Sequence, residues 1–236
     1  CITGCWQNID DIRDHMLNFL ENHDEQRIAS AYFAGDARKA LPALCVSAMM
    51  GNNPFMVYAG QELGEPGMDA EGFSGSDGRT TIFDYWSVSS LRKLTAAKPE
   101  SEMNADEKYL YNYYKQVIHL CKTEAALNDG NFYDLQYANY NRDYGYNCDR
   151  QYAFIRKAGN GQTLLIVANF DDKSVHVGVR IPVHAFDFLL RKGITSATDL
   201  LSGNLQTIEL KPDDVSFVDI SAFSAVVLQL QNSKTK

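Results

Sequence analysis

The sequence predicts a parallel α/β part followed by an antiparallel β-sandwich. In the first half, two short apolar runs flank an amphipathic helix, which is typical of a strand–helix–strand unit in a parallel sheet covered on both faces. In the second half, short runs with a period of two alternate with turn residues, as in antiparallel sheets. We therefore divide the 236 residues into a first domain, 1–127, and a second domain, 128–236.

The first predicted strand, Met16 to Leu20, follows a mixed polar stretch that we expect to be helix or loop. The run ends abruptly in Asn22-His23-Asp24. A buried strand that ends in polar side chains commonly delivers them to the mouth of a site. Asn22, His23 and Asp24 are therefore the first candidate functional residues.

Residues 37–50 predict the helix of this unit. Asp36 is a candidate cap, and Pro42 places the start of the regular part near Leu41. One face carries the apolar residues Leu41, Leu44, Cys45, Ala48 and Met49. The second predicted strand, 54–58, ends at Tyr58.

A long Gly-rich loop, residues 59–87, follows the second strand. A loop of this length is either functional or disordered. Its aromatic and acidic residues, which include Tyr85 and Trp86, favour a functional loop. Residues 104–123 then predict the best helix of the chain, with Asn104 as its cap.

Five β-type runs predict the sandwich: 151–157, 163–170, 175–181, 205–210 and 225–230. Turn signals separate them, for example Gly159-Asn160-Gly161 and Pro212-Asp213-Asp214.

Composition excludes some classes of partner. The net charge is −8 and no basic stripe is present, which argues against nucleic acid. The longest apolar stretch, residues 40–50, is too short to span a bilayer. The five cysteines are scattered, so we interpret most of them as buried thiols rather than disulfides or metal ligands. The 13 tyrosines suit either stacking on sugar rings or ordinary core packing.

A His-Asp pair alone is more often structural than catalytic. Phosphohydrolases that use such a pair also need further metal ligands, and the other four histidines have no metal-ligand spacing: His15, His119, His176 and His184. No Gly-x-Ser-x-Gly motif occurs, although composition leaves a Ser–His–acid triad open.

The combination of motifs is more specific than its parts. Phe19-Leu20-Glu21-Asn22-His23-Asp24, with Arg27 following, resembles the strand-seven motif of the α-amylase family, glycoside hydrolase family 13. Residues 53–62, Asn-Pro-Phe-Met-Val-Tyr-Ala-Gly-Gln-Glu, resemble its strand-eight segment. Residues 114–120 and then 126–130 resemble the last barrel helix and the exit into the C-terminal domain. Segments 152–156, 167–170 and 223–228 resemble parts of that domain.

The resemblance implies a partial (β/α)₈ TIM barrel, its last two strand–helix units, followed by the β-sandwich. It implies cleavage of α-glucosidic bonds with retention. Asp24 would be the third carboxylate, which stabilises the cationic transition state, and His23 would hydrogen-bond the same sugar. The substrate-binding set implied is Asn22, Arg27, Tyr58, Tyr85 and Trp86. For Arg27 we favour orienting the strand-end carboxylates, and for Glu62 structural support, over a sugar contact.

In this family the nucleophile and the general acid lie on strands four and five, which precede the Asn-His-Asp strand. We therefore expect both to be absent from these residues, and the chain to be a C-terminal fragment that is inactive alone. The sandwich, self-association or an N-terminal barrel portion would stabilise it.

The implied partner is an α-glucan or maltooligosaccharide. No cofactor and no metal site are expected here, because the ligands of the calcium frequent in this family would lie largely in the missing part. The sequence does not indicate a compartment. The alternative is a non-catalytic glucan-binding or structural module.

Overall fold

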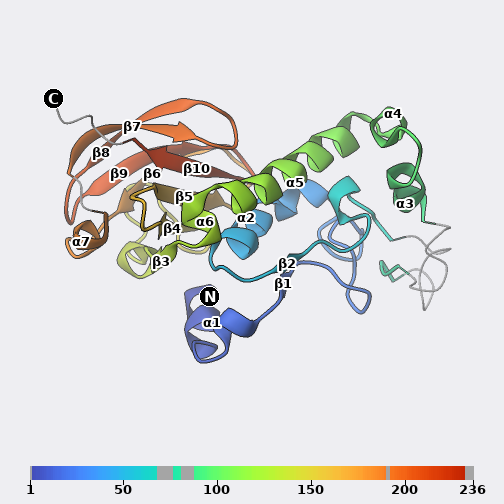
Figure 1. The fold of residues 1–236 in the computed structure, drawn as a ribbon, viewed down its shortest axis with the longest axis horizontal. Helices are drawn as coiled ribbons and strands as arrows, with labels where there is room; N and C mark the ends of the chain where they lie inside the picture. Colours follow the sequence, from blue (N-terminus) through green and yellow to red (C-terminus); the bar gives the residue numbers. More distant parts are fainter. Residues whose placement is uncertain (1, 68–76, 81–87, 190–191, 232–236) are drawn as a thin grey trace.

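Two parts pack against each other in the computed structural model, which describes residues 2–67, 77–80, 88–189 and 192–231 (Figure 1). One part holds a pair of short strands and most of the helices. The other is a β-sandwich, and the long helix α5, Ala105–Thr123, runs between the outer helices and the sandwich (Figure 1). No described helix is both long and apolar enough to cross a membrane.

The predicted parallel strand pair is present but short. β1, Asn18–Phe19, pairs in parallel with β2, Phe55–Met56, and Asn18 lies opposite Phe55. Helix α2, Leu41–Met49, connects them, as a parallel connection requires. The prediction that the first strand is buried is wrong: Leu17 is 46% and Phe19 44% exposed. Only two strands are described in this sheet, so no described strand pairs with the other edge of β1.

The connecting helix begins as predicted. Asp36 accepts a hydrogen bond from the backbone N–H of Arg38 (2.9 Å) and caps a 3₁₀ turn, η2, Ala37–Ala40. Pro42 lies in the first turn of α2, where its missing N–H costs nothing. The predicted apolar face of α2 is buried, with Leu44, Cys45 and Met49 at 0% exposure.

Helix α5 confirms the strongest helix prediction. The Asn104 side chain accepts from the Glu107 backbone N–H (2.9 Å), and the Glu107 carboxylate accepts from the Asn104 N–H (2.8 Å). This capping box satisfies two donors that would otherwise lack partners. The buried face of α5, which includes Leu110, Tyr114 and Val117, belongs to the same core as α2.

The sandwich consists of a six-stranded sheet and a two-stranded one. The larger sheet has the order β3-β4-β5-β10-β7-β8 and the smaller one pairs β6 with β9, all antiparallel. All five predicted strands are present: β4 (Gln151–Lys157), β5 (Thr163–Asn169), β6 (Val175–Arg180), β8 (Leu205–Leu210) and β10 (Ser224–Leu230). Three further strands were not predicted: β3 (Asn131–Asp134), β7 (Gly193–Asp199) and β9 (Val215–Ile220).

The centre of the large sheet is buried on both faces, because alternate side chains enter different cores. Phe154 and Ile166 pack with the helices α2 and α5 in one core. Ile155 and Leu165 pack with residues of β6 and β9 in the other. The sandwich therefore covers one side of the helical part.

Arg156 of β4 joins the two parts. Its guanidinium donates to the carbonyl oxygens of Met50 (2.7 Å), Ala126 (3.0 Å) and Gly130 (2.8 Å), and to the Asn52 side chain. Its side chain is 1% exposed, and no described carboxylate pairs with it. Burial lowers the pKa of Arg156 to about 10.

The other helices among the described residues are short. They are α1 (Ile2–Asn8), η1 (Arg13–His15), η3 (Gln61–Leu63), α3 (Ser89–Leu94), α4 (Pro99–Glu102), α6 (Ala125–Asn128), η5 (Gln136–Asn139) and α7 (Ala185–Leu189). The domain boundary between residues 127 and 128 falls within α6 and stays a prediction.

Candidate active site

The turn after β1 exposes the predicted catalytic side chains. Asn22 Oδ1 accepts hydrogen bonds from the backbone N–H groups of Asp24 (2.8 Å) and Glu25 (3.0 Å). The His23 ring lies beside Asp24, with Nε2 and Oδ1 3.5 Å apart. The side chains of His23 and Asp24 are 53% and 76% exposed. Asn22 therefore fixes the backbone of the turn, while His23 and Asp24 remain accessible to a ligand.

A buried ion pair connects the two ends of this turn. Arg27 Nη1 and Glu21 Oε2 are 2.8 Å apart, and the side chains are 2% and 3% exposed. The other oxygen of Glu21 accepts from the Ile28 backbone N–H (2.7 Å). Residues 21 and 27 flank the turn, so the pair closes it in the way a short crosslink would.

The other two nitrogens of the Arg27 guanidinium are also bonded within the protein. Nε donates to Thr80 Oγ1 (2.9 Å), and Nη2 donates to the Ala59 carbonyl oxygen (2.8 Å). The guanidinium carbon also lies 4.2 Å from the centre of the Tyr58 ring. This geometry suits a positioning role. The carboxylate that Arg27 touches is Glu21.

Tyr58 connects the end of β2 to α5. Its backbone N–H donates to Gln61 Oε1 (3.1 Å), and Gln61 Nε2 donates to the Tyr114 hydroxyl (2.9 Å). Gly60, between them, has a φ of 88°, and a Cβ there would lie 2.6 Å from Ser90 Oγ. The turn at residues 58–61 therefore requires glycine.

Glu62 is a half-buried carboxyl group close to this network. Burial raises its pKa above the ordinary value, while the positive charge of Arg27 opposes the shift. Its Oε2 has no hydrogen-bond partner. The predicted preference for structural support over a sugar contact stays untested.

The structure gathers five of the seven predicted site residues around the ends of β1 and β2. Asn22, His23 and Asp24 form the exposed turn, while Arg27 and Tyr58 lie in the network that holds it. Tyr85 and Trp86 lie outside the described residues. Their roles toward a substrate, and those of the other five, stay predictions.

Sequence reasoning missed two residues of the supporting network, Glu21 and Thr80. Glu21 belongs to the motif that ends in Asp24, but it is buried where Asp24 is exposed. The available signal was the spacing of Glu21 and Arg27, an acidic and a basic residue six positions apart on the two sides of a polar turn. Thr80 carries no signal of its own, because a loop brings it to Arg27.

The described residues contain no group of three or more His, Cys, Asp or Glu side chains placed to hold a metal ion. Whether the protein binds calcium stays untested.

Comparison with known proteins identifies the sandwich. Residues 146–231 match the family model for the α-amylase C-terminal all-beta domain. A search of curated protein sequences finds no match.

Solved structures with the same fold include several α-amylases. The α-amylase of Geobacillus thermoleovorans, complexed with acarbose, is 18% identical with a TM-score of 0.65, and the match covers 99% of this chain and 43% of that one. An Anoxybacillus α-amylase is 19% identical with a TM-score of 0.63, covering 100% and 43%. The α-amylase of H. orenii is 20% identical with a TM-score of 0.56, covering 95% and 43%. The chain thus spans less than half the length of the structures it matches.

Proposed function

This chain has the fold of the C-terminal portion of an α-amylase family protein, and from that premise we propose that it contributes to a retaining glycosidase acting on α-glucans. Asp24 supplies a carboxylate that stabilises the transition state, and His23 donates a hydrogen bond to the same sugar. The nucleophile and the general acid come from residues outside these 236. The Geobacillus thermoleovorans α-amylase was solved with acarbose bound, which supports a glucan-like ligand for this chain.

One observation carries the proposal. Asp24 follows the C-terminal end of β1, which pairs in parallel with β2, and it is exposed in a turn fixed by Asn22 and closed by the Arg27–Glu21 pair. In barrels of parallel strands, that end is where catalytic side chains gather.

The chemistry follows from electrostatics. Glycosidic bond cleavage develops positive charge on the sugar ring and its oxygen. A carboxylate held beside that charge stabilises it without having to reorient during the reaction. Asp24 can serve because the turn holds its backbone in place while its side chain stays accessible.

The supporting residues have separate tasks in this proposal. Asn22 holds the backbone of the turn, and Arg27 holds Glu21 and the Tyr58 ring. Asn22 and Arg27 therefore act by positioning other residues. Tyr58, Tyr85 and Trp86 supply aromatic surface to the substrate, an α-glucan or maltooligosaccharide. No cofactor is part of the proposal.

Hydrolysis of maltoheptaose tests it, measured with the 236-residue chain and with the longer protein that includes its upstream coding sequence. We expect turnover only for the longer protein, and NMR of fresh products should show the α-anomer first. Turnover by the 236 residues alone would contradict the assignment of the nucleophile and acid to residues outside them.

A second candidate function is a non-catalytic glucan-binding module. A large polar cavity beside the sandwich, apart from the Asp24 turn, favours it. The same assay separates the two functions: a longer protein that binds maltoheptaose without cleaving it would be a binding module.

A further inference from the structure

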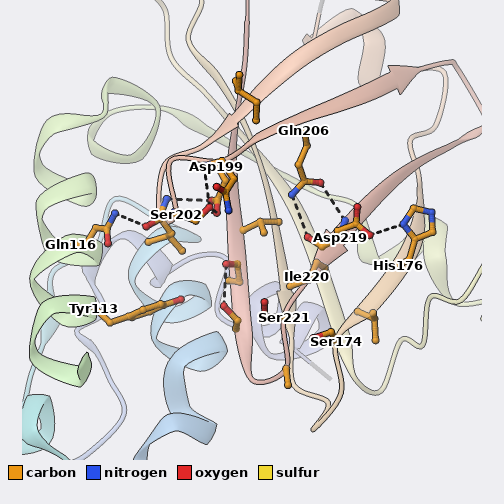
Figure 2. Close-up of a pocket in the computed structure, with 18 of the residues that line it drawn as sticks. Tyr113, Gln116, Ser174, His176, Asp199, Ser202, Gln206, Asp219, Ile220 and Ser221 are labelled. Atoms are coloured by element: carbon orange, nitrogen blue, oxygen red, sulfur yellow. Dashed lines mark hydrogen bonds and ion pairs between the residues drawn. The ribbon is translucent and has the colours of Figure 1, made fainter. Parts of the chain in front are cut away.

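A cavity of about 1110 Å³ lies between α5 and the sandwich, and no residue of the Asn22-His23-Asp24 turn lines it (Figure 2). Three elements supply its polar walls. These are α5, the β6–β9 pair and the turn between β7 and β8, with the side chains Tyr109, Asn112, Gln116, His176, Asp219, Asn204 and Gln206.

The sandwich wall holds polar groups in fixed positions. His176 Nδ1 lies 2.8 Å from Asp219 Oδ1, although these side chains are 61% and 76% exposed. The Gln206 amide bonds the backbone of Asp219 twice, donating to its carbonyl oxygen and accepting from its N–H, both at 3.2 Å (Figure 2). Preorganised polar side chains of this kind lower the entropic cost of binding a ligand.

The helix wall holds groups with unused bonding capacity. Asn112 is exposed, and its amide makes no hydrogen bond to the other described residues. It therefore has two donors and an acceptor available to a ligand. Tyr109, one turn earlier, is 48% exposed, and although the Arg38 guanidinium lies 5.1 Å from its ring centre, the rest of the ring offers an aromatic surface.

Aromatic surface continues from the cavity along the outer face of β6 and β9. The His176 ring stacks on Phe217, with centroids 4.9 Å apart and planes at 4°. Phe217 is 43% exposed, and the Tyr144 ring meets it edge-on at 6.4 Å. A sugar ring has apolar faces and a rim of hydroxyl groups. Aromatic side chains beside polar groups can therefore contact both parts of it.

The charge of the cavity selects against anions. No lysine or arginine is found among the described residues that line it, and two aspartates are. The Asp199 carboxylate already accepts from the backbone N–H of Leu201 (3.2 Å) and of Val227 (2.9 Å). The cavity therefore disfavours a phosphate or a carboxylate, and its amide, hydroxyl and carboxylate groups can bond the hydroxyl groups of a neutral ligand.

We propose that this cavity binds a neutral α-glucan chain at a second site, separate from the Asp24 turn. The choice of an α-glucan among neutral sugars rests on the proposed function. Tyr109 stacks on a sugar ring, and Asn112, His176 and Asp219 bond its hydroxyl groups. A site here holds a long chain against the protein while the chemistry takes place elsewhere.

Titration calorimetry of the 236-residue chain with maltoheptaose tests the second site. We expect Tyr109→Ala and Asn112→Ala each to weaken binding by about five-fold, the effect of one stacking or hydrogen-bonding contact. Tyr111→Ala is the matched control, because Tyr111 lies on the same helix, contacts Lys115 and does not line the cavity. Melting temperatures should show that all three variants remain folded.

Absence of binding, or equal binding by the cavity variants and the natural chain, would overturn the second site. Cellohexaose is expected to bind more weakly, and equal binding would overturn the assignment to α-glucans. Failure of the proposed function looks different: the longer protein would bind through the cavity without cleaving maltoheptaose. If instead the longer protein cleaves maltoheptaose but the cavity variants bind it as well as the natural chain does, only the second site is overturned.

Discussion

The guanidinium of Arg27 and the carboxylate of Glu21 form a buried ion pair, 2.8 Å between Nη1 and Oε2, that closes the turn presenting Asp24. Both groups make further bonds inside the protein, since Glu21 also accepts from the Ile28 N–H and Arg27 also bonds Thr80 and Ala59. A buried pair that is also hydrogen-bonded to its surroundings is costly to break from one side. The geometry of the exposed turn therefore depends on two residues that a ligand does not reach.

Arg27→Met should destabilise the chain strongly. It leaves the Glu21 carboxylate buried without its partner, and we expect a loss of about 3–5 kcal/mol in the free energy of unfolding. Urea unfolding measures it. Arg38→Met is the control: the Arg38–Asp106 pair is 47% and 76% exposed, and such surface pairs contribute about 0–1 kcal/mol. Equal losses in the two variants would contradict the structural importance of the buried pair.

Arg156→Met should allow the helical part and the sandwich to unfold independently of each other. The variant leaves the carbonyl oxygens of Met50, Ala126 and Gly130 buried without this donor. Unsatisfied buried acceptors cost about 1–3 kcal/mol each, so we expect a loss of at least about 2 kcal/mol. Calorimetric unfolding should then show two transitions where the natural chain shows one. A single, unshifted transition would mean that Arg156 does not couple the parts.

The elements that the sequence predicts well are those whose signals are local. The capping residues Asp36 and Asn104 and the proline at position 42 place two helix starts correctly. Strands β4 and β8 match their predicted bounds because turn residues flank regular β-type runs. The period of two in β9 was also readable, although the apolar residue Phe217 lies on the exposed face of the strand.

Other features depend on contacts that no local pattern contains. The exposure of Phe19 follows from which strands are present beside it. The bonding of Arg27 depends on Thr80, 53 residues away, and that of Arg156 on Met50, 106 residues away. The turn of the candidate site could thus be recognised from its motif, whereas the network that supports it could not.

Glu62 should make stability depend on pH. Its folded-state pKa is raised by burial, so the folded state holds this proton more tightly than the unfolded state does. The free energy of unfolding therefore falls as pH rises from the ordinary glutamic acid range through the raised pKa. Glu62→Gln removes this penalty and should raise the melting temperature at pH 7, with a smaller gain at pH 4.

Melting curves of Glu62→Gln at the two pH values test this, with Glu25→Gln, an exposed carboxyl in the candidate turn, as the control. A gain that is equal at both pH values, or a loss at pH 7, would contradict an unfavourable buried charge at Glu62.

The cysteines should differ sharply in reactivity. Burial raises the pKa of the Cys45 thiol to about 12 and that of Cys121 to about 11, whereas Cys5 is exposed. Alkylation requires the thiolate and access to it. At pH 8 we expect iodoacetamide to label Cys5 within minutes, and Cys45 and Cys121 only after unfolding in urea. Mass mapping of the labelled peptides reads this out, and rapid native labelling of Cys45 would place it outside the core.

The central claim is that Asp24 stabilises positive charge on a glucan, and kcat on maltoheptaose of the longer protein carrying Asp24→Asn tests it most directly. Removing one preorganised stabilising group typically costs about 10²–10³ in kcat. Asp24 is 76% exposed, so the substitution should leave the melting temperature unchanged. Glu25→Gln, the next residue of the same turn, is the control and should retain its activity. A loss of kcat by about 10² or more in Asp24→Asn alone is the result predicted here; an unchanged kcat, or equal losses in both variants, would contradict it.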